Sequence, residues 1–371
     1  MTQTISVSCK LEVSPELKGQ IDPTIEAFSS ACNHVLKVSK EVKQRNTTKL
    51  HHLVYHDIRA LYGLKANHAC QAIRRVVHAL KTRNKVRKFN PTSLSLDART
   101  FSYRETDQHV GITLLKGRVW LPLRIGNYQL ALLAGQKPTS AVLVKRRNGD
   151  YYIQIQVDIP TQPPGKTPKV IGVDLGRRDI AHTSTGTSWK GDKAQATRGR
   201  YFNTRRSIQR KRTKSSRKLL KRLSGKEARF RKNINHTISK QIVNEAQRTG
   251  SAIGLEDLSG IRQRAKVRKS QRREHHGWSF YQLRSFIEYK ANIAGVPVIL
   301  VPPAHTSKTC SRCGHIGQRN GKDFKCGHCG LHVDSDWNGA NNISKLGVAV
   351  VQPGISGMMC QLEGQLSILV A

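Results

Sequence analysis

Residues 306–343 read TSKTCSRCGHIGQRNGKDFKCGHCGLHVDSDWNGANNI, and this stretch decides the fold. It contains two Cys-x-x-Cys pairs, Cys310 with Cys313 and Cys326 with Cys329, separated by twelve residues. Four thiolates at this spacing can converge tetrahedrally on one Zn²⁺ at about 2.3 Å. Two disulfides are the alternative, but the other cysteines are scattered without a framework spacing. We therefore predict a zinc ribbon, which is structural because four thiolates leave no open position for catalysis.

Carboxylates stand at three separate places in the C-terminal half, each at the end of an apolar strand or the start of a helix. Asp174 lies in VIGVDLG, Glu256 lies in AIGLEDL, and Asp334 and Asp336 directly follow the ribbon. A lone buried carboxylate costs several kcal/mol or takes up a proton, and a bound cation removes that penalty. These acids are therefore candidate cation ligands.

Acids without a neighbouring Ser, His or Cys nucleophile pattern suit two-metal phosphoryl transfer. Two Mg²⁺ about 4 Å apart, held by shared carboxylates, activate water and stabilise the leaving 3′ oxygen. Oxygen ligands favour Mg²⁺ or Mn²⁺ over the soft metal of the ribbon. In this scheme Asp174 bridges both metals, and Glu256 and the last Asp complete the set. The alternation of strand, acid and helix over 170–345 also favours an RNase H-like α/β fold with the ribbon inserted before the final helix.

The charge predicts a polyanionic partner. The 371 residues hold 64 Lys and Arg against 24 Asp and Glu, a formal net charge of +40. A free protein this basic repels itself, so nucleic acid is expected to cover much of its surface. No run approaches 18 apolar residues, which argues against a membrane, and no secretory signal is visible at the start, so we expect a cytoplasmic, nucleoid-associated protein. Aromatic residues make up 6%, so backbone neutralisation should dominate over base stacking.

Basic residues are densest in two segments. Residues 198–232 contain sixteen Lys or Arg and one acid, and residues 262–273 contain seven basic residues. Solvated helix faces are the alternative, but sixteen like charges without compensating acids are hard to keep folded alone. The nucleic-acid contacts that we predict are Gln71, Arg74, Arg75, Arg205, Arg206, Arg210, Lys211, Arg212, Lys214, Arg217, Arg268 and Lys269.

The N-terminal half begins with an alternating strand over residues 4–13, after which Ser14-Pro15-Glu16 predicts a helix start. Helical periodicity continues to about Arg87, and residues 91–160 change to period two, with a hairpin turn at Asn148-Gly149. We expect a small antiparallel sheet or barrel that the first strand completes, with the helices as an insertion. The Pro-rich linker 161–168 marks the main domain boundary.

Six strings, in order, carry a resemblance: IGVDLG, GLEDLSG, GWSFYQLRSFIEYKA, TSKTCSRCG, FKCGHCG and DSDWNGANNI. Over about residues 165–345 the chain resembles the TnpB family, transposon-encoded RNA-guided DNA endonucleases related to the compact type V CRISPR effectors. The resemblance implies a multidomain chain: an N-terminal wedge β-barrel with an inserted α-helical recognition domain, then an RNase H-like (RuvC) α/β domain with an inserted zinc ribbon. The implied parts are 1–13 (wedge strand), 14–90 (recognition domain), 91–165 (wedge barrel), 166–304 (RuvC-like domain), 305–332 (zinc ribbon) and 333–371 (RuvC C-terminal helix and tail).

The resemblance also implies roles. Asp174, Glu256 and Asp336 become the catalytic acids, and Asp336 is preferred to Asp334 because the family's last acid directly precedes x-Asn-Gly/Ala-Ala. Asp334 and Asp257 then orient or cap. The implied partners are a guide RNA from the transposon end and double-stranded DNA with a short adjacent motif read by the N-terminal half, with a monomer favoured. The alternatives are a DNA-binding protein without cleavage, RNA-guided or using its zinc ribbon, an accessory transposase, and an RNA-processing enzyme that uses the same site.

Overall fold

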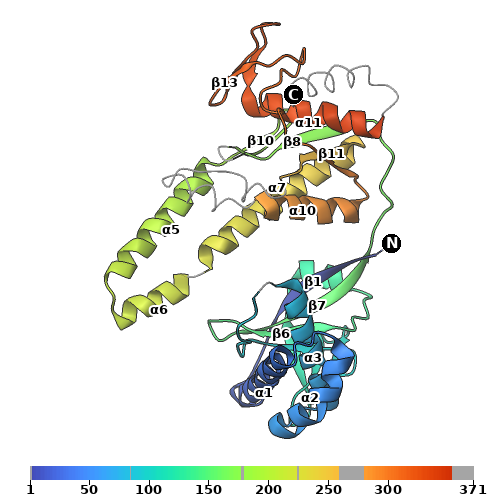
Figure 1. The fold of residues 1–371 in the computed structure, drawn as a ribbon, viewed down its shortest axis with the longest axis vertical. Helices are drawn as coiled ribbons and strands as arrows, with labels where there is room; N and C mark the ends of the chain where they lie inside the picture. The colour runs from blue at the N-terminus through green and yellow to red at the C-terminus, as the bar shows by residue number, and fades with distance from the viewer. Residues whose placement is uncertain (1, 84, 177–178, 224, 259–279, 353–371) are drawn as a thin grey trace. The chain divides into compact units, whose positions relative to one another are not determined.

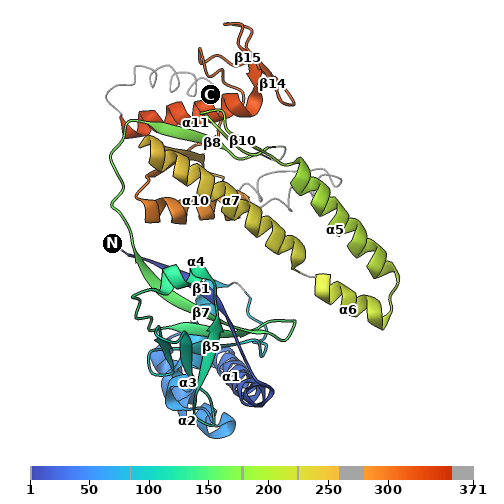
Figure 2. The ribbon, with the colours of Figure 1, turned by 180° about the vertical axis from the view of Figure 1, so that it is seen from behind.

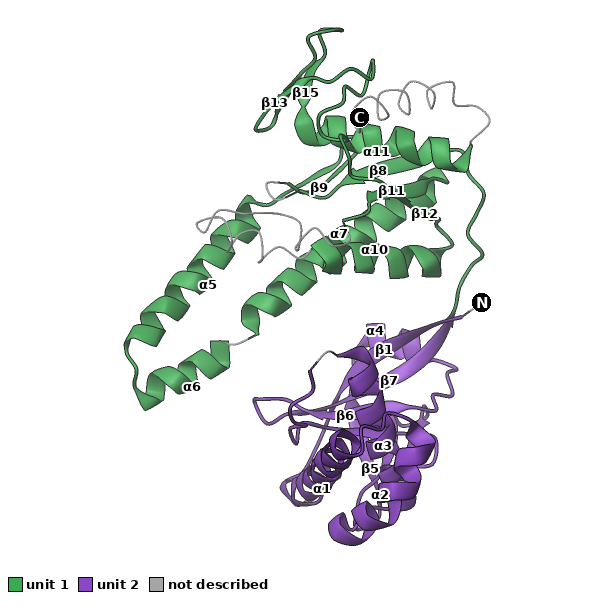
Figure 3. Cartoon of the chain, viewed as in Figure 1, with its two compact units in different colours: residues 1, 160–371 green, residues 2–159 purple. Residues whose placement is uncertain are grey.

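The computed structural model describes residues 2–83, 85–176, 179–223, 225–258 and 280–352. The chain forms two compact units, one of residues 2–159 and the other of residue 1 with residues 160–371 (Figure 3). The second unit holds the ribbon and all three predicted acids. The predicted contacts Arg268 and Lys269 lie outside the described residues.

The N-terminal unit combines a seven-stranded antiparallel sheet with helices inserted after its first strand. The sheet order is β2-β6-β7-β1-β5-β4-β3. Its elements are β1 (Thr2–Leu11), α1 (Pro15–Glu41), α2 (Thr47–Tyr62), α3 (Ala66–Thr82), β2 (Ser93–Leu96), β3 (Phe101–Arg104), β4 (His109–Thr113), β5 (Arg118–Arg124), α4 (Asn127–Leu133), β6 (Ala141–Lys145) and β7 (Tyr151–Pro160). Ser14 caps α1 by accepting a hydrogen bond from the Leu17 N–H, which confirms the predicted helix start.

The sheet of this unit is strongly curled but is not a closed barrel. Among the described strands, its two edge strands are not hydrogen-bonded to each other. Its two edges, β2 and β3, are joined by only the four residues 97–100. That connection spans at most about 17 Å, whereas seven flat strands at about 4.8 Å spacing would be about 29 Å wide. The predicted barrel is therefore an open but strongly curled sheet. Its core includes Phe28 and Ile25 of α1 and Ile73 of α3, all fully buried.

The C-terminal unit is built on a five-stranded sheet of order β10-β9-β8-β11-β12. β8 pairs parallel to β11 and β11 parallel to β12, while β9 runs antiparallel to β8. The elements are β8 (Val170–Asp174), β9 (Asp179–Thr183), β10 (Ser188–Lys190), α5 (Asp192–Arg210), α6 (Lys214–Leu223), α7 (Lys226–Thr249), β11 (Ala252–Glu256), α10 (Phe280–Ala294), β12 (Val298–Val301), β13 (Gln318–Asn320), β14 (Asp323–Lys325), β15 (His332–Asp334) and α11 (Ser335–Val351). Strands β13 to β15 form the separate three-stranded sheet of the ribbon.

Helices cover both faces of the five-stranded sheet (Figures 1 and 2). On one face, Ile171 and Leu255 pack with Ile242 of α7 and Ile287 of α10. On the other face, Val170, Ala252 and Val301 pack against Ile343 of α11. Because both faces are buried, β8 and β11 read as nearly continuous apolar runs that end in an acid.

The backbone of α11 lies directly against the backbone of β8. A Cβ added at Gly172 would lie 2.0 Å from the Ala340 carbonyl oxygen and 2.4 Å from the Ser344 nitrogen. The Ser344 hydroxyl also donates to the Val170 carbonyl at 2.6 Å. Only glycine at position 172 permits this approach, which brings the first turn of α11 beside the end of β8.

A basic helical arm extends from this sheet. α5 runs outward, α6 turns, and α7 returns to pack on the sheet (Figures 1 and 2). The outer part of the arm has few buried side chains, among them Ile208 and Ser216. No described helix combines the length and the apolar character that crossing a membrane requires.

We predict that Gly172→Ala lowers the stability of the C-terminal unit by at least about 1–3 kcal/mol, because the added methyl group would displace α11. Thermal melting of the full chain measures the effect. Gly199→Ala is the matched control: a Cβ there meets nothing within 4 Å, and alanine favours the helix by about 0.5–1 kcal/mol. Equal melting temperatures for wild type and Gly172→Ala would contradict the close approach.

Candidate functional site

The three predicted acids lie at one edge of the five-stranded sheet. Asp174 is the last residue of β8, and Glu256 is the last residue of the neighbouring parallel strand β11. Asp336 is the second residue of α11, and a Cβ on Gly339 one turn later would lie 3.0 Å from Asp174 Oδ2. The oxygens of the three carboxylates are not all within 4.8 Å of one another. A single ion would therefore not contact all three carboxylates in this conformation.

Burial makes this group of acids electrostatically unfavourable by itself. Burial raises the pKa of Asp174 to about 8, and the charges of Glu256 and Asp336 add to the shift. Burial also raises the pKa of Glu256 and that of Asp336. A cation among these oxygens would hold all three in the charged form, so the donor set fits hard divalent cations such as Mg²⁺ or Mn²⁺.

Arg319, in strand β13 of the ribbon, is the positive charge that the structure places beside the acids. Its Nη2 lies 3.0 Å from Asp336 Oδ1, and its charge lowers the pKa of Asp174, Glu256 and Asp336, against the effect of burial. Arg319 was not among the predicted site residues, because the sequence shows it only as one basic residue in the segment between the two cysteine pairs. The one available signal was that this segment must form a hairpin to bring the two pairs together, so a basic residue in it could reach beyond the cysteines.

A second ion pair joins the ribbon to the sheet. Lys322, in the turn between β13 and β14, places Nζ 2.6 Å from Oδ2 of Asp179, the first residue of β9. The Asp179 side chain is only 6% exposed, so this lysine compensates a buried charge. Asp179 lies five residues after Asp174 in the sequence, but nothing in the sequence indicates that Lys322 is its partner.

The neighbouring acids have local roles, as the sequence analysis expected. Asp334 is the N-cap of α11, where its Oδ1 accepts from the Asp336 and Trp337 N–H groups at 2.8 and 3.2 Å. Asp257 pairs with Arg284 of α10 at 2.8 Å. Thr306 donates a hydrogen bond to Glu256 Oε1, so the start of the ribbon segment also orients that carboxylate.

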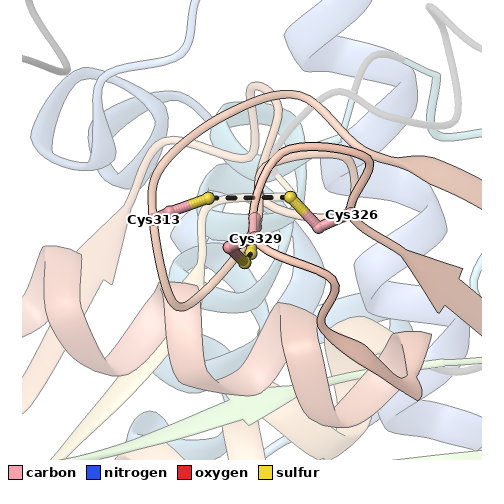
Figure 4. Close-up of side chains that lie close together, drawn as sticks. Cys313, Cys326 and Cys329 are labelled. Carbon is pink, nitrogen blue, oxygen red and sulfur yellow. Dashed lines mark hydrogen bonds between the residues drawn. The ribbon is translucent and has the colours of Figure 1, made fainter.

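The four ribbon cysteines form a cluster that can hold zinc. Figure 4 shows the sulfur atoms of Cys313, Cys326 and Cys329 directed toward one another. The Sγ atoms of Cys310 and Cys329 are 3.6 Å apart, as are those of Cys313 and Cys326. Tetrahedral ligands at about 2.3 Å from zinc would be about 3.8 Å apart, and a disulfide would need about 2 Å. The pKa shifts within this cluster oppose one another: the backbone N–H of Cys329 lowers the pKa of Cys326, whereas the pKa values of Cys310 and Cys313 are raised.

Buried amide side chains of α11 connect the ribbon to the acid edge. Asn338 Oδ1 accepts from the Ser311 N–H at 2.8 Å, and its Nδ2 donates to the Thr309 carbonyl at 2.7 Å. Asn342, one turn later, donates to the Thr306 and Thr309 carbonyls, each at 2.7 Å. These contacts give a physical reason for two of the three asparagines in the string DSDWNGANNI, Asn338 and Asn342.

The predicted nucleic-acid contacts lie in three different settings. Gln71 donates to Asp97 Oδ2 at 3.0 Å and Arg75 to the Ser93 carbonyl at 3.0 Å, so both bind within the N-terminal unit, whereas Arg74 is exposed. On the arm, Arg205 pairs with Glu227 at 2.5 Å. The remaining arm candidates are exposed: Arg206, Arg210, Lys211, Arg212, Lys214 and Arg217.

Two family models match the C-terminal part of the chain. The one described as "Cas12f1-like, TNB domain" matches residues 280–343, and the one described as "Probable transposase" matches residues 153–275. The first match covers the ribbon and the start of α11, and the second covers the arm and the strands that carry Asp174 and Glu256.

Known proteins are similar to parts of this chain. The CRISPR-associated endodeoxyribonuclease Cas12f1 of Sulfoacidibacillus thermotolerans is 32% identical over 243 residues, covering 57% of this chain and 54% of its own. The TnpB-like protein MJ0751 of Methanocaldococcus jannaschii is 39% identical over 129 residues, covering 34% of this chain and 46% of its own. This chain thus spans about half the length of the curated relatives it matches. A solved Cas12f1–sgRNA–target DNA complex contains a chain of similar fold, with a TM-score of 0.63, 13% identity, and coverage of 92% of this chain and 99% of that chain.

We predict one zinc ion per chain when the protein is purified without chelator, because the four thiolates have the spacing of a closed tetrahedral site. Cys326→Ser should remove the zinc and raise hydrogen exchange across residues 310–334. The control is Cys70→Ser, since Cys70 lies in the other unit and outside the cluster. Zinc retained in full by Cys326→Ser, measured by elemental analysis, would contradict the assignment.

We predict that Lys322→Met loosens the ribbon locally, because it leaves the buried Asp179 carboxylate without its ion pair. The expected loss is about 1–3 kcal/mol, and the double variant Asp179→Asn with Lys322→Met should recover part of it. Hydrogen exchange of residues 318–325 measures the change, and Lys325→Met is the control on an exposed lysine of the same hairpin. If the free-energy change from hydrogen exchange in the double variant equals the sum of the changes in the two single variants, the two residues do not interact.

Proposed function

We propose that this chain, a relative of the TnpB-like and Cas12f proteins, is an RNA-guided endonuclease that hydrolyses DNA phosphodiester bonds. The resemblance predicted from its motifs is confirmed by these relatives. The observation that carries the proposal is the meeting of Asp174, Glu256 and Asp336 at one buried edge, from three separate segments of the chain.

The architecture supports this function. The sheet order β10-β9-β8-β11-β12 agrees with an RNase H-like (RuvC) nuclease domain. In this order β8 is the central strand, β9 is antiparallel to it and β11 is parallel to it. We assign residues 166–304 and 333–371 to that domain and 305–332 to its zinc ribbon. The wedge then comprises residues 1–13 and 91–165, and the inserted helices 14–90 form the recognition domain.

In the proposed mechanism the three carboxylates hold two divalent cations, Mg²⁺ or Mn²⁺. These ions, when bound, supply a nucleophile at neutral pH and stabilise the charge that develops on the phosphate. Asp174, whose pKa is affected by both other acids, would be the ligand common to both ions. Thr306 orients Glu256, and the missing side chain of Gly339 leaves room for the Asp174 carboxylate. Arg319 lies at the same edge, where its guanidinium can donate to a DNA phosphate once the acids are neutralised by cations.

The charge distribution supports nucleic-acid partners. The exposed lysines and arginines of α5 and α6 form a basic arm that neutralises phosphates, and sequence specificity comes from pairing between a guide RNA and the target strand. We propose that the guide RNA derives from the transposon end, that the N-terminal unit reads a short motif beside the target, and that the protein acts as a monomer. Of the nucleic-acid contacts predicted in this unit, Gln71, Arg74 and Arg75, only Arg74 has an exposed side chain.

The description "Probable transposase" of one matching model favours a strand transferase as the second candidate function. RNase H-like folds with three acids suit both reactions, because each is an in-line attack at a phosphodiester. The two functions differ in what they require: a transferase needs transposon ends and no RNA, whereas a guided nuclease needs RNA that matches its target.

The test is to purify the full chain, sequence the RNA that accompanies it, and assay cleavage of DNA matching that RNA with Mg²⁺. We expect one enriched RNA species and RNA-dependent cleavage. Asp174→Asn should lower the cleavage rate by at least roughly a thousandfold, since it removes the shared cation ligand. The control is Asp323→Asn, because the Asp323 side chain is 75% exposed.

Unchanged cleavage by Asp174→Asn would overturn the assignment of the site. Random cellular RNA without an enriched species would overturn the guided part. Activity on transposon ends in the absence of RNA would favour the transferase.

A further inference from the structure

Trp120 is an unusual residue on the outward face of the N-terminal sheet. It stands in the middle of β5, where alternate residues such as Leu121 and Leu123 are buried in the core. The indole is 43% exposed, although burying it would be favourable by several kcal/mol. The fold therefore leaves part of this aromatic surface accessible to a ligand.

Two arginines lie beside this indole. The guanidinium carbon of Arg104 lies 4.4 Å from the centre of the Trp120 ring, and that of Arg118 lies 5.9 Å from it. Each guanidinium is itself fixed: Arg104 Nε donates to Asp107 Oδ1 at 2.8 Å, and Arg118 Nη2 donates to Ser102 Oγ at 2.6 Å. The three side chains therefore form a preorganised surface.

Gly111 makes the space in which these side chains lie. It stands opposite Trp120 on β4 and opposite Ser102 on β3. A Cβ at this position would lie 2.7 Å from Ser102 Oγ, 2.9 Å from Arg118 Nε and 3.2 Å from Trp120 Cη2. The φ angle of Gly111 is not in the positive range, so its backbone conformation would accept another residue. The missing side chain instead leaves room for the side chains of Ser102, Arg118 and Trp120.

We propose that Trp120, with Arg104 and Arg118, is a stacking site for an unpaired base of the RNA bound by this chain. The proposal rests on the function proposed above, since it takes RNA as the ligand. An exposed aromatic ring beside guanidinium groups provides a face for a base and donors for its phosphates. A cationic ligand is disfavoured because two arginines already lie beside the ring.

The ligand is RNA and not the target DNA for a reason of pairing. Bases of the target duplex and of the strand that pairs with the guide are stacked on neighbouring base pairs, so among the target DNA only the displaced strand could compete for the ring. A folded RNA offers loops and ends whose bases are unstacked, and these are the parts that proteins read by stacking. The overall scarcity of aromatic residues agrees with one such site, while the arm neutralises phosphates.

The test compares full-length Trp120→Ala and Trp120→Phe for binding to a short single-stranded oligoadenylate RNA over a range of salt concentrations. Loss of the ring should weaken binding roughly 5- to 100-fold, by the same factor at every salt concentration, and Phe should restore most of it. Arg118→Ala should instead reduce the slope of log K against log salt by about one. Tyr128→Ala is the control, because Tyr128 is 71% exposed on α4 of the same unit.

Ultraviolet crosslinking adds a readout that does not depend on a variant: a nucleotide adduct on the peptide that contains Trp120. Unchanged RNA affinity of Trp120→Ala, or an adduct that forms only with duplex DNA, would overturn the stacking site. Guided cleavage by the wild type would be unaffected by that result. Conversely, if the wild type does not cleave DNA while Trp120→Ala clearly loses RNA affinity, the nuclease assignment is overturned and the stacking site is kept.

Discussion

Asp174, Glu256 and Asp336 lie where β8 and β11 end and α11 begins, and burial keeps water from screening their mutual repulsion. Such a group either takes up protons, as the raised pKa of Asp174 indicates, or is compensated by positive charge from Arg319 or bound cations. The rest of the C-terminal unit is arranged to hold them in that position. β8 and β11 are parallel neighbours, and Gly172 lets α11 cross against β8 so that its first turn reaches the same edge.

The ribbon acts on this edge from outside the sheet. Its zinc cluster can fix the two cysteine pairs, and Asn338 and Asn342 connect the first pair to α11. The opposite hairpin carries Arg319 to Asp336 and Lys322 to Asp179. The ribbon that carries the cysteine cluster thus positions the Arg319 guanidinium beside the acids. We infer that loss of zinc would disturb the acid edge through these contacts.

Much of this arrangement could be predicted from the sequence, because it follows from local rules. Apolar strands ending in an acid place Asp174 and Glu256 at strand termini, and parallel neighbours bring such termini together. The paired cysteines predict a metal site from spacing alone. The helix start at Ser14 follows from capping chemistry.

The remainder depends on tertiary contacts that have no local pattern. Nothing near Lys322 indicates that it pairs with Asp179, which precedes it by 143 residues. Gln71 and Arg75 resemble exposed helix polar residues in the sequence, yet they bind Asp97 and Ser93 within the unit. The exposure of Trp120 was equally hidden, since a strand with period two predicts which residues alternate and not which face stays open.

Under the proposed function, the three carboxylates act together as one binding site for divalent cations. Electron paramagnetic resonance titration of Mn²⁺ against the full chain, with zinc content measured in the same samples, tests this. We expect two bound Mn²⁺ per chain in the wild type, lost in the variant with Asp174→Asn, Glu256→Gln and Asp336→Asn while zinc is retained. Equal Mn²⁺ binding by the wild type and that variant would contradict it.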